Sequence, residues 1–245
     1  MQVVRKRKFF GERGSGTGRS FSDLLVDDCV FHWCVLSQTV EPDKLAQVRN
    51  VQVCNCRLLH PVAIGPSVIR NVTVENIETQ TELVCWHPLL QHVTLRGRIG
   101  RIKIETYPCV EARYFKPEPL LRAFEKANAQ YYSEVDWALD IREAHAEMLD
   151  IQGVPWHLIR RDRETQLFID RRVADDPHWC EHIRADNHWI DYVEERFMNP
   201  DIDKLLLVAP KALPQAEYER ILSDLHELRQ AGKTTAEEES KCRRG

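Results

Sequence analysis

The chain has 245 residues, a formal net charge of −4 at pH 7 and a hydrophobic content of 43%. It is long enough to bury a sizeable core and to hold two subdomains. The sequence lacks both an apolar stretch of membrane-spanning length and an apolar export signal, which argues against a membrane protein. We therefore expect a cytoplasmic protein, and its eight scattered cysteines fit a reducing compartment better than a disulfide framework.

The first twenty residues are basic, with six lysines and arginines against one glutamate, and residues 11–20 are rich in glycine and serine. This composition predicts a solvated tail ending in a linker over residues 1–20. The remainder of the chain is acidic, whereas a dedicated nucleic-acid-binding fold usually carries a basic stripe. We therefore expect no nucleic-acid binding except through the run Arg5, Lys6, Arg7 and Lys8.

A repeat follows: VRNVQVCN at 48–55 recurs as IRNVTVEN at 69–76, and looser copies begin at residues 21 and 90. A period of about 21 residues indicates stacked copies of one supersecondary unit. Three columns of the alignment are apolar in every copy, as strands with one buried face require. They are Phe21, Val48, Ile69 and Leu90; Leu24, Val51, Val72 and Val93; and Val26, Val53, Val74 and Leu95.

From this repeat we predict an α+β protein. A short right-handed parallel β-solenoid, of about four coils of ~21 residues, would occupy residues 21–112. A helix-rich α+β cap would follow over residues 113–232, because an open solenoid end exposes backbone and apolar interior that must be covered. Residues 233–245 read as a disordered tail by composition.

Two further columns of the repeat hold small polar residues, which tolerate left-handed backbone angles and suit corners. We expect a ladder of corner side chains, with a carboxylate-lined active site as the alternative. The two columns are Asp23, Asn50, Asn71 and His92, and Asp28, Asn55, Asn76 and Gly97.

Other polar columns should point outward and form a flat face for a partner. The residues of that predicted binding face are Arg49, Gln52, Arg70, Thr73, Gln91 and Thr94.

The second half alternates helical and strand patterns, bounded by proline and glycine. The expected helices cover 118–130, 134–150, 178–198 and 214–230. We also expect a hairpin of 156–161 with 167–171, and a buried strand at 205–209.

The densest reactive cluster lies near His178 and His182, which would share a helix face and could both reach one metal. One helix supplies only two ligands, whereas zinc requires three or four. We therefore interpret this segment as a polar helix face, with a partial metal site as the alternative.

No constellation of residues reaches catalytic completeness. The sequence therefore favours a non-enzymatic protein-interaction protein without a cofactor, such as an adaptor or a toxin-neutralising protein, that binds a protein partner through the solenoid face. The alternative is an enzyme, possibly a metal-dependent hydrolase, with its site at the junction of solenoid and cap.

Overall fold

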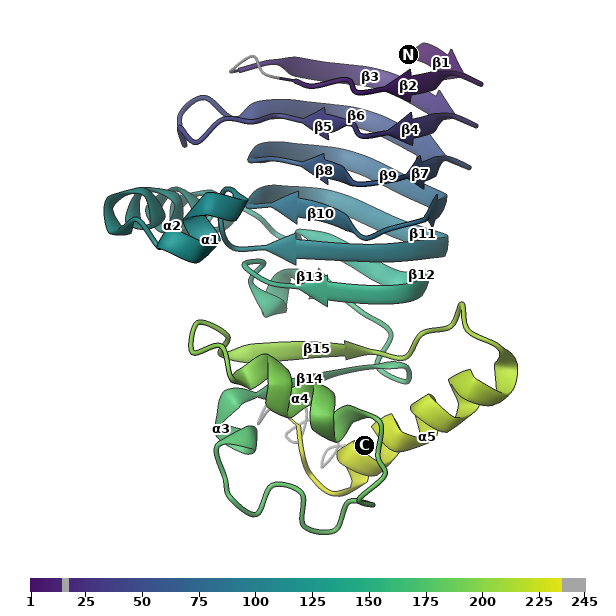
Figure 1. Ribbon diagram of the computed structural model, residues 1–245, viewed down its shortest axis with the longest axis vertical. Helices are drawn as coiled ribbons and strands as arrows, with labels where there is room; N and C mark the ends of the chain where they lie inside the picture. Colours follow the sequence, from purple (N-terminus) through teal and green to yellow (C-terminus); the bar gives the residue numbers. More distant parts are fainter. Residues whose placement is uncertain (15–17, 235–245) are drawn as a thin grey trace. The chain divides into compact units, whose positions relative to one another are not determined.

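The computed structural model describes residues 1–14 and 18–234 (Figure 1). The chain divides into two compact units, Met1–Arg161 and Asp162–Gly245. Most of the tail expected at 233–245, from residue 235 onward, lies outside the described residues. Every helix among the described residues is too short or too polar to span a membrane.

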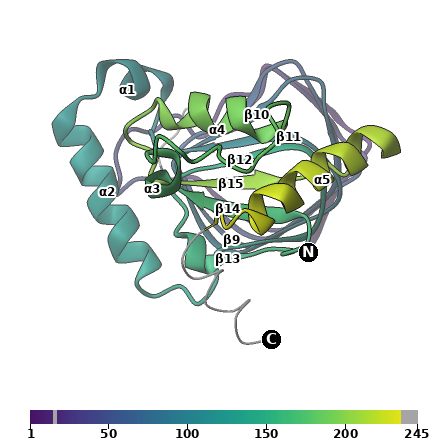
Figure 2. The same ribbon diagram turned by 90° about the horizontal axis from the view of Figure 1, so that it is seen from below.

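The first unit is built from strands that pair almost wholly in parallel in one 13-stranded sheet. The strands stack in successive rows and curl around an interior, with two helices outside (Figures 1 and 2). Their bounds are β1 (Gln2–Arg5), β2 (Lys8–Phe10), β3 (Ser20–Asp27), β4 (Val30–His32), β5 (Val35–Leu36), β6 (Ala46–Cys54), β7 (Arg57–Leu59), β8 (Val62–Ile64), β9 (Ser67–Thr79), β10 (Leu83–Trp86), β11 (Pro88–Glu105), β12 (Leu139–Ile151) and β13 (Ile159–Arg160).

This curled sheet corrects the expected fold class. A four-coil right-handed β-solenoid with a helix-rich cap is wrong: the structure is a large, mostly parallel curled sheet with few helices. β9 and β11 run unbroken for 13 and 18 residues, beyond both ends of the repeat copies that begin at residues 69 and 90. Residues 1–10, expected within a tail, supply β1 and β2, which pair in parallel with β3 and β4.

The expected helix over 134–150 is also wrong, because most of that segment forms β12. Its sequence is rich in alanine and glutamate, which favour helices locally. The exposed edge of β11 overrides this preference by pairing with β12 from Val93↔Leu139 to Ile104↔Ile151. Ala144 and Ala146 are buried and His145 is exposed, which is the alternation of a strand with one covered face.

The expected corners are confirmed. All eight residues of the two small polar columns have positive φ, including Asn50 and Asn71 at +54° and Gly97 at +67°. Their side chains bond between rows: Asn71 Nδ2 donates to Asn50 Oδ1 at 3.2 Å. Asn50 Nδ2 donates in turn to Asp23 Oδ1 at 3.0 Å. Because asparagine and aspartate tolerate left-handed backbone, the chain turns at the same place in each row.

Two helices, α1 (Val110–Phe115) and α2 (Glu118–Tyr132), lie between β11 and β12 in the chain. The helix expected at 118–130 is thereby confirmed. α2 is anchored to the sheet by Phe124, which is 1% exposed, and by the Tyr132 hydroxyl, which accepts a 3.1 Å bond from Leu90 N.

The second unit contains β14 (Gln166–Asp170) and β15 (Lys204–Val208), paired antiparallel, with α3 (Arg171–Ala174), α4 (Trp189–Phe197) and α5 (Gln215–Gln230). Its core is apolar and centred on Leu167, Val193 and Leu225, each 0% exposed. The strand expected at 205–209 and the last helix are confirmed. The expected hairpin is wrong, because residues 156–158 form a 3₁₀ turn, β13 pairs with β12, and β14 takes β15 as its partner.

The helix expected from His178 to Met198 covers only Trp189–Phe197. Residues 177–188 form turns that are held by side-chain bonds to the backbone. Asp176 Oδ1 accepts from His178 N at 2.9 Å, and Asp224 Oδ2 accepts from His188 N at 3.1 Å. Such bonds offer the backbone an alternative to helical pairing.

Candidate functional site

The six residues of the predicted binding face lie together on the outside of the curled sheet. Arg49, Arg70 and Gln91 are in register across β6, β9 and β11 and form one row. Gln52, Thr73 and Thr94 form a second row in the same way. Arg49 and Gln52 are exposed, and the other four are half-buried.

The first row borders a groove of about 470 Å³ on the outer side of the sheet. Arg70 and Gln91 of the predicted face line it, whereas the remaining four predicted residues lie outside its lining. Helix α2 and the segment that follows it supply one side of the groove, and the loop before β6 supplies another. The α2 side consists of Ala127, Gln130, Tyr131, Glu134 and Val135, and the loop side consists of Pro42, Asp43 and Leu45.

Arg70 is oriented by α2. Its Nε donates to the Tyr131 hydroxyl at 3.2 Å, and its guanidinium lies 5.2 Å from the centre of the Tyr131 ring. Burial raises the pKa of Tyr131, although the bond from Arg70 and the charges of Arg70 and Arg49 oppose that rise. The phenol is therefore neutral at physiological pH and acts as a hydrogen-bonding group.

Arg70, which lines the groove, and Arg49, which lies outside its lining, are neighbours on adjacent strands. Like charges directly opposite in a sheet destabilise it. Arg49 donates to Gln47 Oε1 at 2.9 Å, and Arg70 donates to a phenol. Within the described part of the chain, neither guanidinium has a carboxylate at ion-pair distance. Guanidinium groups of this kind complement carboxylate or phosphate groups.

The groove combines charged, polar and apolar side chains. The side chains that line it include no cysteine, serine, threonine or histidine. Asp43 and Glu134 also line it, which adds acceptors for backbone N–H groups or basic side chains of a bound segment.

The histidines of the alternative metal site lie in the second unit, in turns and not on a helix. The spacing argument therefore fails, since it required a shared helix face. His178 and Glu181 are both largely exposed and pair at 2.8 Å, and His182 has a φ of +70°. No group of three histidine, cysteine, aspartate or glutamate side chains among the described residues is placed to hold a metal ion.

The basic run Arg5–Lys8 lies at the corner between β1 and β2 and is exposed throughout. Arg5 Nε donates to Asp27 Oδ2 at 2.7 Å, so one cation of the basic run already has an anionic partner. The bond from Asn55 and the contact with Arg5 hold the pKa of Asp27 below its ordinary value.

Sequence reasoning missed the contribution of α2, because that helix was assigned to a separate cap. The only signal was the pair Tyr131–Tyr132 at the end of an amphipathic run, and such aromatic residues are common anchors. Comparisons with known proteins give no match to a family model, to a curated protein or to a solved structure. A function must therefore be inferred from the chemistry of the molecule itself.

Proposed function

We propose that this chain is a non-enzymatic protein-binding protein. Its groove between the β9–β11 surface and α2 receives an extended segment of a protein partner, with an acidic side chain placed against Arg49 and Arg70. The observation that carries this proposal is the pair of registered arginines, which lack a carboxylate partner among the described residues.

The composition of the groove supports this proposal. Arginine and tyrosine are the residue types that most often dominate binding energy at protein interfaces. Arg70 and Tyr131 are held in one arrangement by their mutual contact, so little rotamer freedom is lost when a partner binds.

The size of the groove favours a short partner segment that anchors a wider protein–protein interface. A cavity of about 470 Å³ accommodates a few residues, whereas a stable interface buries roughly 800 Å² on each partner. The second row, Gln52, Thr73 and Thr94, lies on the same three strands, on the other side of the corner column. It would supply part of the polar rim of that interface.

The test is a selection of extended peptides from a random library on the immobilised full chain. We expect enrichment of peptides that contain aspartate or glutamate. Arg70→Glu should weaken their binding by at least tenfold, because a hydrogen bond to a charged group contributes about 1.5–3 kcal/mol. Arg57→Glu is the matched control, since Arg57 is an exposed arginine on β7 that does not line the groove.

Two results would contradict the proposal. The first is enrichment of peptides without any preference for acidic residues. The second is equal weakening by Arg70→Glu and Arg57→Glu, because a general effect of net charge does not depend on the groove.

A further inference from the structure

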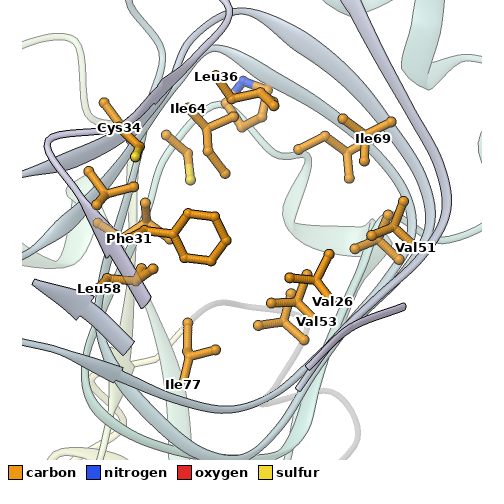
Figure 3. Close-up of a pocket in the computed structure, with 18 of the residues that line it drawn as sticks. Val26, Phe31, Cys34, Leu36, Val51, Val53, Leu58, Ile64, Ile69 and Ile77 are labelled. Atoms are coloured by element: carbon orange, nitrogen blue, oxygen red, sulfur yellow. The ribbon is translucent and has the colours of Figure 1, made fainter. Parts of the chain in front are cut away.

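The interior of the curled sheet contains a cavity of about 660 Å³. Figure 3 shows aliphatic and aromatic side chains, among them Val26, Phe31 and Ile69, that converge on an open centre. Residues from nearly every row of strands line it, from Val4 on β1 to Leu139 on β12. The twelve residues of the three apolar columns all contribute, which confirms their inward orientation.

This volume is far larger than a packing defect. Protein interiors are packed at the density of organic crystals, and voids larger than a water molecule are few. An apolar cavity of ~150 Å³ already binds benzene, and it stays dry because water needs polar partners. A cavity of about 660 Å³ lies within the range of ligand pockets.

The side chains become more buried from one end of the cavity to the other. In the first column, Phe21 and Val48 are half-buried, whereas Ile69 is 8% and Leu90 is 3% exposed. In the third column, Val26 is half-buried and Leu95 is 5% exposed. The side chains that line the cavity are therefore more exposed to solvent in the β1 and β3 rows than in the β11 row.

The length of the cavity follows from the pairing order β1-β3-β6-β9-β11, with β12 next to β11. Five steps of about 4.8 Å span about 24 Å. One leaflet of a bilayer is about 15 Å of hydrocarbon, which is the length of one lipid chain. A methylene group is close in size to a water molecule, whose share of liquid volume is about 30 Å³, so a chain of sixteen to eighteen carbons takes up roughly 500 Å³.

Charged groups gather at the β1 end. Arg13 and Glu12 line the cavity there, and Lys6, Arg7 and Lys8 lie at the exposed corner between β1 and β2. Glu12 opposes this charge, but the cations outnumber it. An amphiphile with an anionic head group complements this end, and its apolar tail complements the interior.

We propose that the cavity binds one long-chain fatty acid, with its tail inserted from the β1 end and its carboxylate at Arg13. A single chain, about 15 Å long and roughly 500 Å³ in volume, fits within the cavity, whereas the two chains of a phospholipid take up about twice that volume and exceed it. This site is separate from the groove beside α2, since the two share no lining residue.

The experiment titrates octanoate, dodecanoate and hexadecanoate into the delipidated full chain by calorimetry. Affinity should rise about fourfold for each additional methylene that is buried. Hexadecylamine should bind at least tenfold more weakly than hexadecanoate, because its head group is cationic. An affinity that does not depend on chain length, or no binding of any acid, would overturn the proposal.

Two variants locate the site. Val26→Trp places an indole in the cavity and should reduce hexadecanoate affinity by at least tenfold. Leu25→Trp is the matched control, because Leu25 lies on the same strand but is not among the cavity-lining residues. Arg13→Glu should weaken binding of each acid about tenfold without changing the dependence on chain length.

Thermal unfolding distinguishes a filled cavity from a misfolded variant. Hexadecanoate should raise the melting temperature of the wild-type chain and of Leu25→Trp, but not that of Val26→Trp. Without ligand, Val26→Trp should melt no lower than Leu25→Trp, since the added ring occupies empty space. Equal losses of affinity in both variants would overturn the proposal. Two further outcomes would do the same: binding to phosphatidylglycerol vesicles without binding of the free acids, or a stable dimer that excludes the acids.

Discussion

Replacing Glu105 by glutamine tests whether a buried ion cluster stabilises the curled sheet beneath α1. The Glu105 side chain is 2% exposed, and its Oε1 lies 3.0 Å from Lys103 Nζ. The same oxygen lies 3.1 Å from Nη1 of Arg113 on α1. Asp150, which is 8% exposed, lies 3.8 Å from Lys103. Lys103 is 13% exposed, so its charge is poorly solvated.

The expected cost of the substitution is about 3 kcal/mol. Removing one partner from a buried ion pair costs roughly 3–5 kcal/mol, because the remaining charge is left uncompensated. Lys103 keeps Asp150 as a more distant partner, which places the expected loss at the lower end of this range. Arg113 is 42% exposed, so its share of the interaction is small through solvent screening. A loss of 3 kcal/mol corresponds to more than a hundredfold change in the folding equilibrium.

Urea unfolding followed by circular dichroism measures this loss. Glu118→Gln is the control, because Glu118 pairs with Arg122 at 2.7 Å but both side chains are largely exposed. That substitution should cost no more than about 0.5 kcal/mol. If Glu105→Gln costs no more than the control, the cluster does not stabilise the fold and the reasoning is refuted.

Three more outcomes are expected. Burial lowers the pKa of His87 from its ordinary value of 6.5. Below pH 6.5 the unfolded chain therefore binds a proton that the folded chain does not, and the free energy of unfolding should fall as pH drops from 6.5 through the lowered pKa. His87→Asn should flatten this dependence in calorimetric melts over the same range, and an unchanged slope would rule out His87 as its source. Asn71 has a φ of +54°, so Asn71→Ala should lose about 1 kcal/mol more than Asn71→Gly; equal melting temperatures would argue against backbone strain. Val193 is 0% exposed, so Val193→Ala should cost roughly 2 kcal/mol by urea unfolding, whereas Met198→Ala, at an 82% exposed position, should leave the midpoint unchanged.

Local patterns predicted the local properties of the first unit. The spacing of Leu24, Val26 and their counterparts identified which side chains face inward, because residues two apart on a strand share a face. The small polar columns identified the corners, since few residue types tolerate left-handed backbone. Two of the six outward residues, Arg70 and Gln91, line the groove that supports the proposed function.

The predictions failed where a distant partner decided the outcome. Residues 139–151 have the composition of a helix, but pairing with the long edge of β11 makes them a strand. Residues 178–188 have the spacing of a helix face, but bonds to Asp176 and Asp224 hold them in turns. Local preference is worth only fractions of a kcal/mol per residue, so tertiary pairing overrides it.

The sequence by itself determined which residues face the interior, where the chain turns and which polar side chains line up on the outside. The tertiary structure alone decided that these rows form one curled sheet, that α2 completes the groove beside Arg70, and that the apolar columns surround a cavity of about 660 Å³. Side-chain direction is a property of neighbouring residues along the chain. A groove or a cavity depends on the distance between segments far apart in the sequence, which only their packing sets.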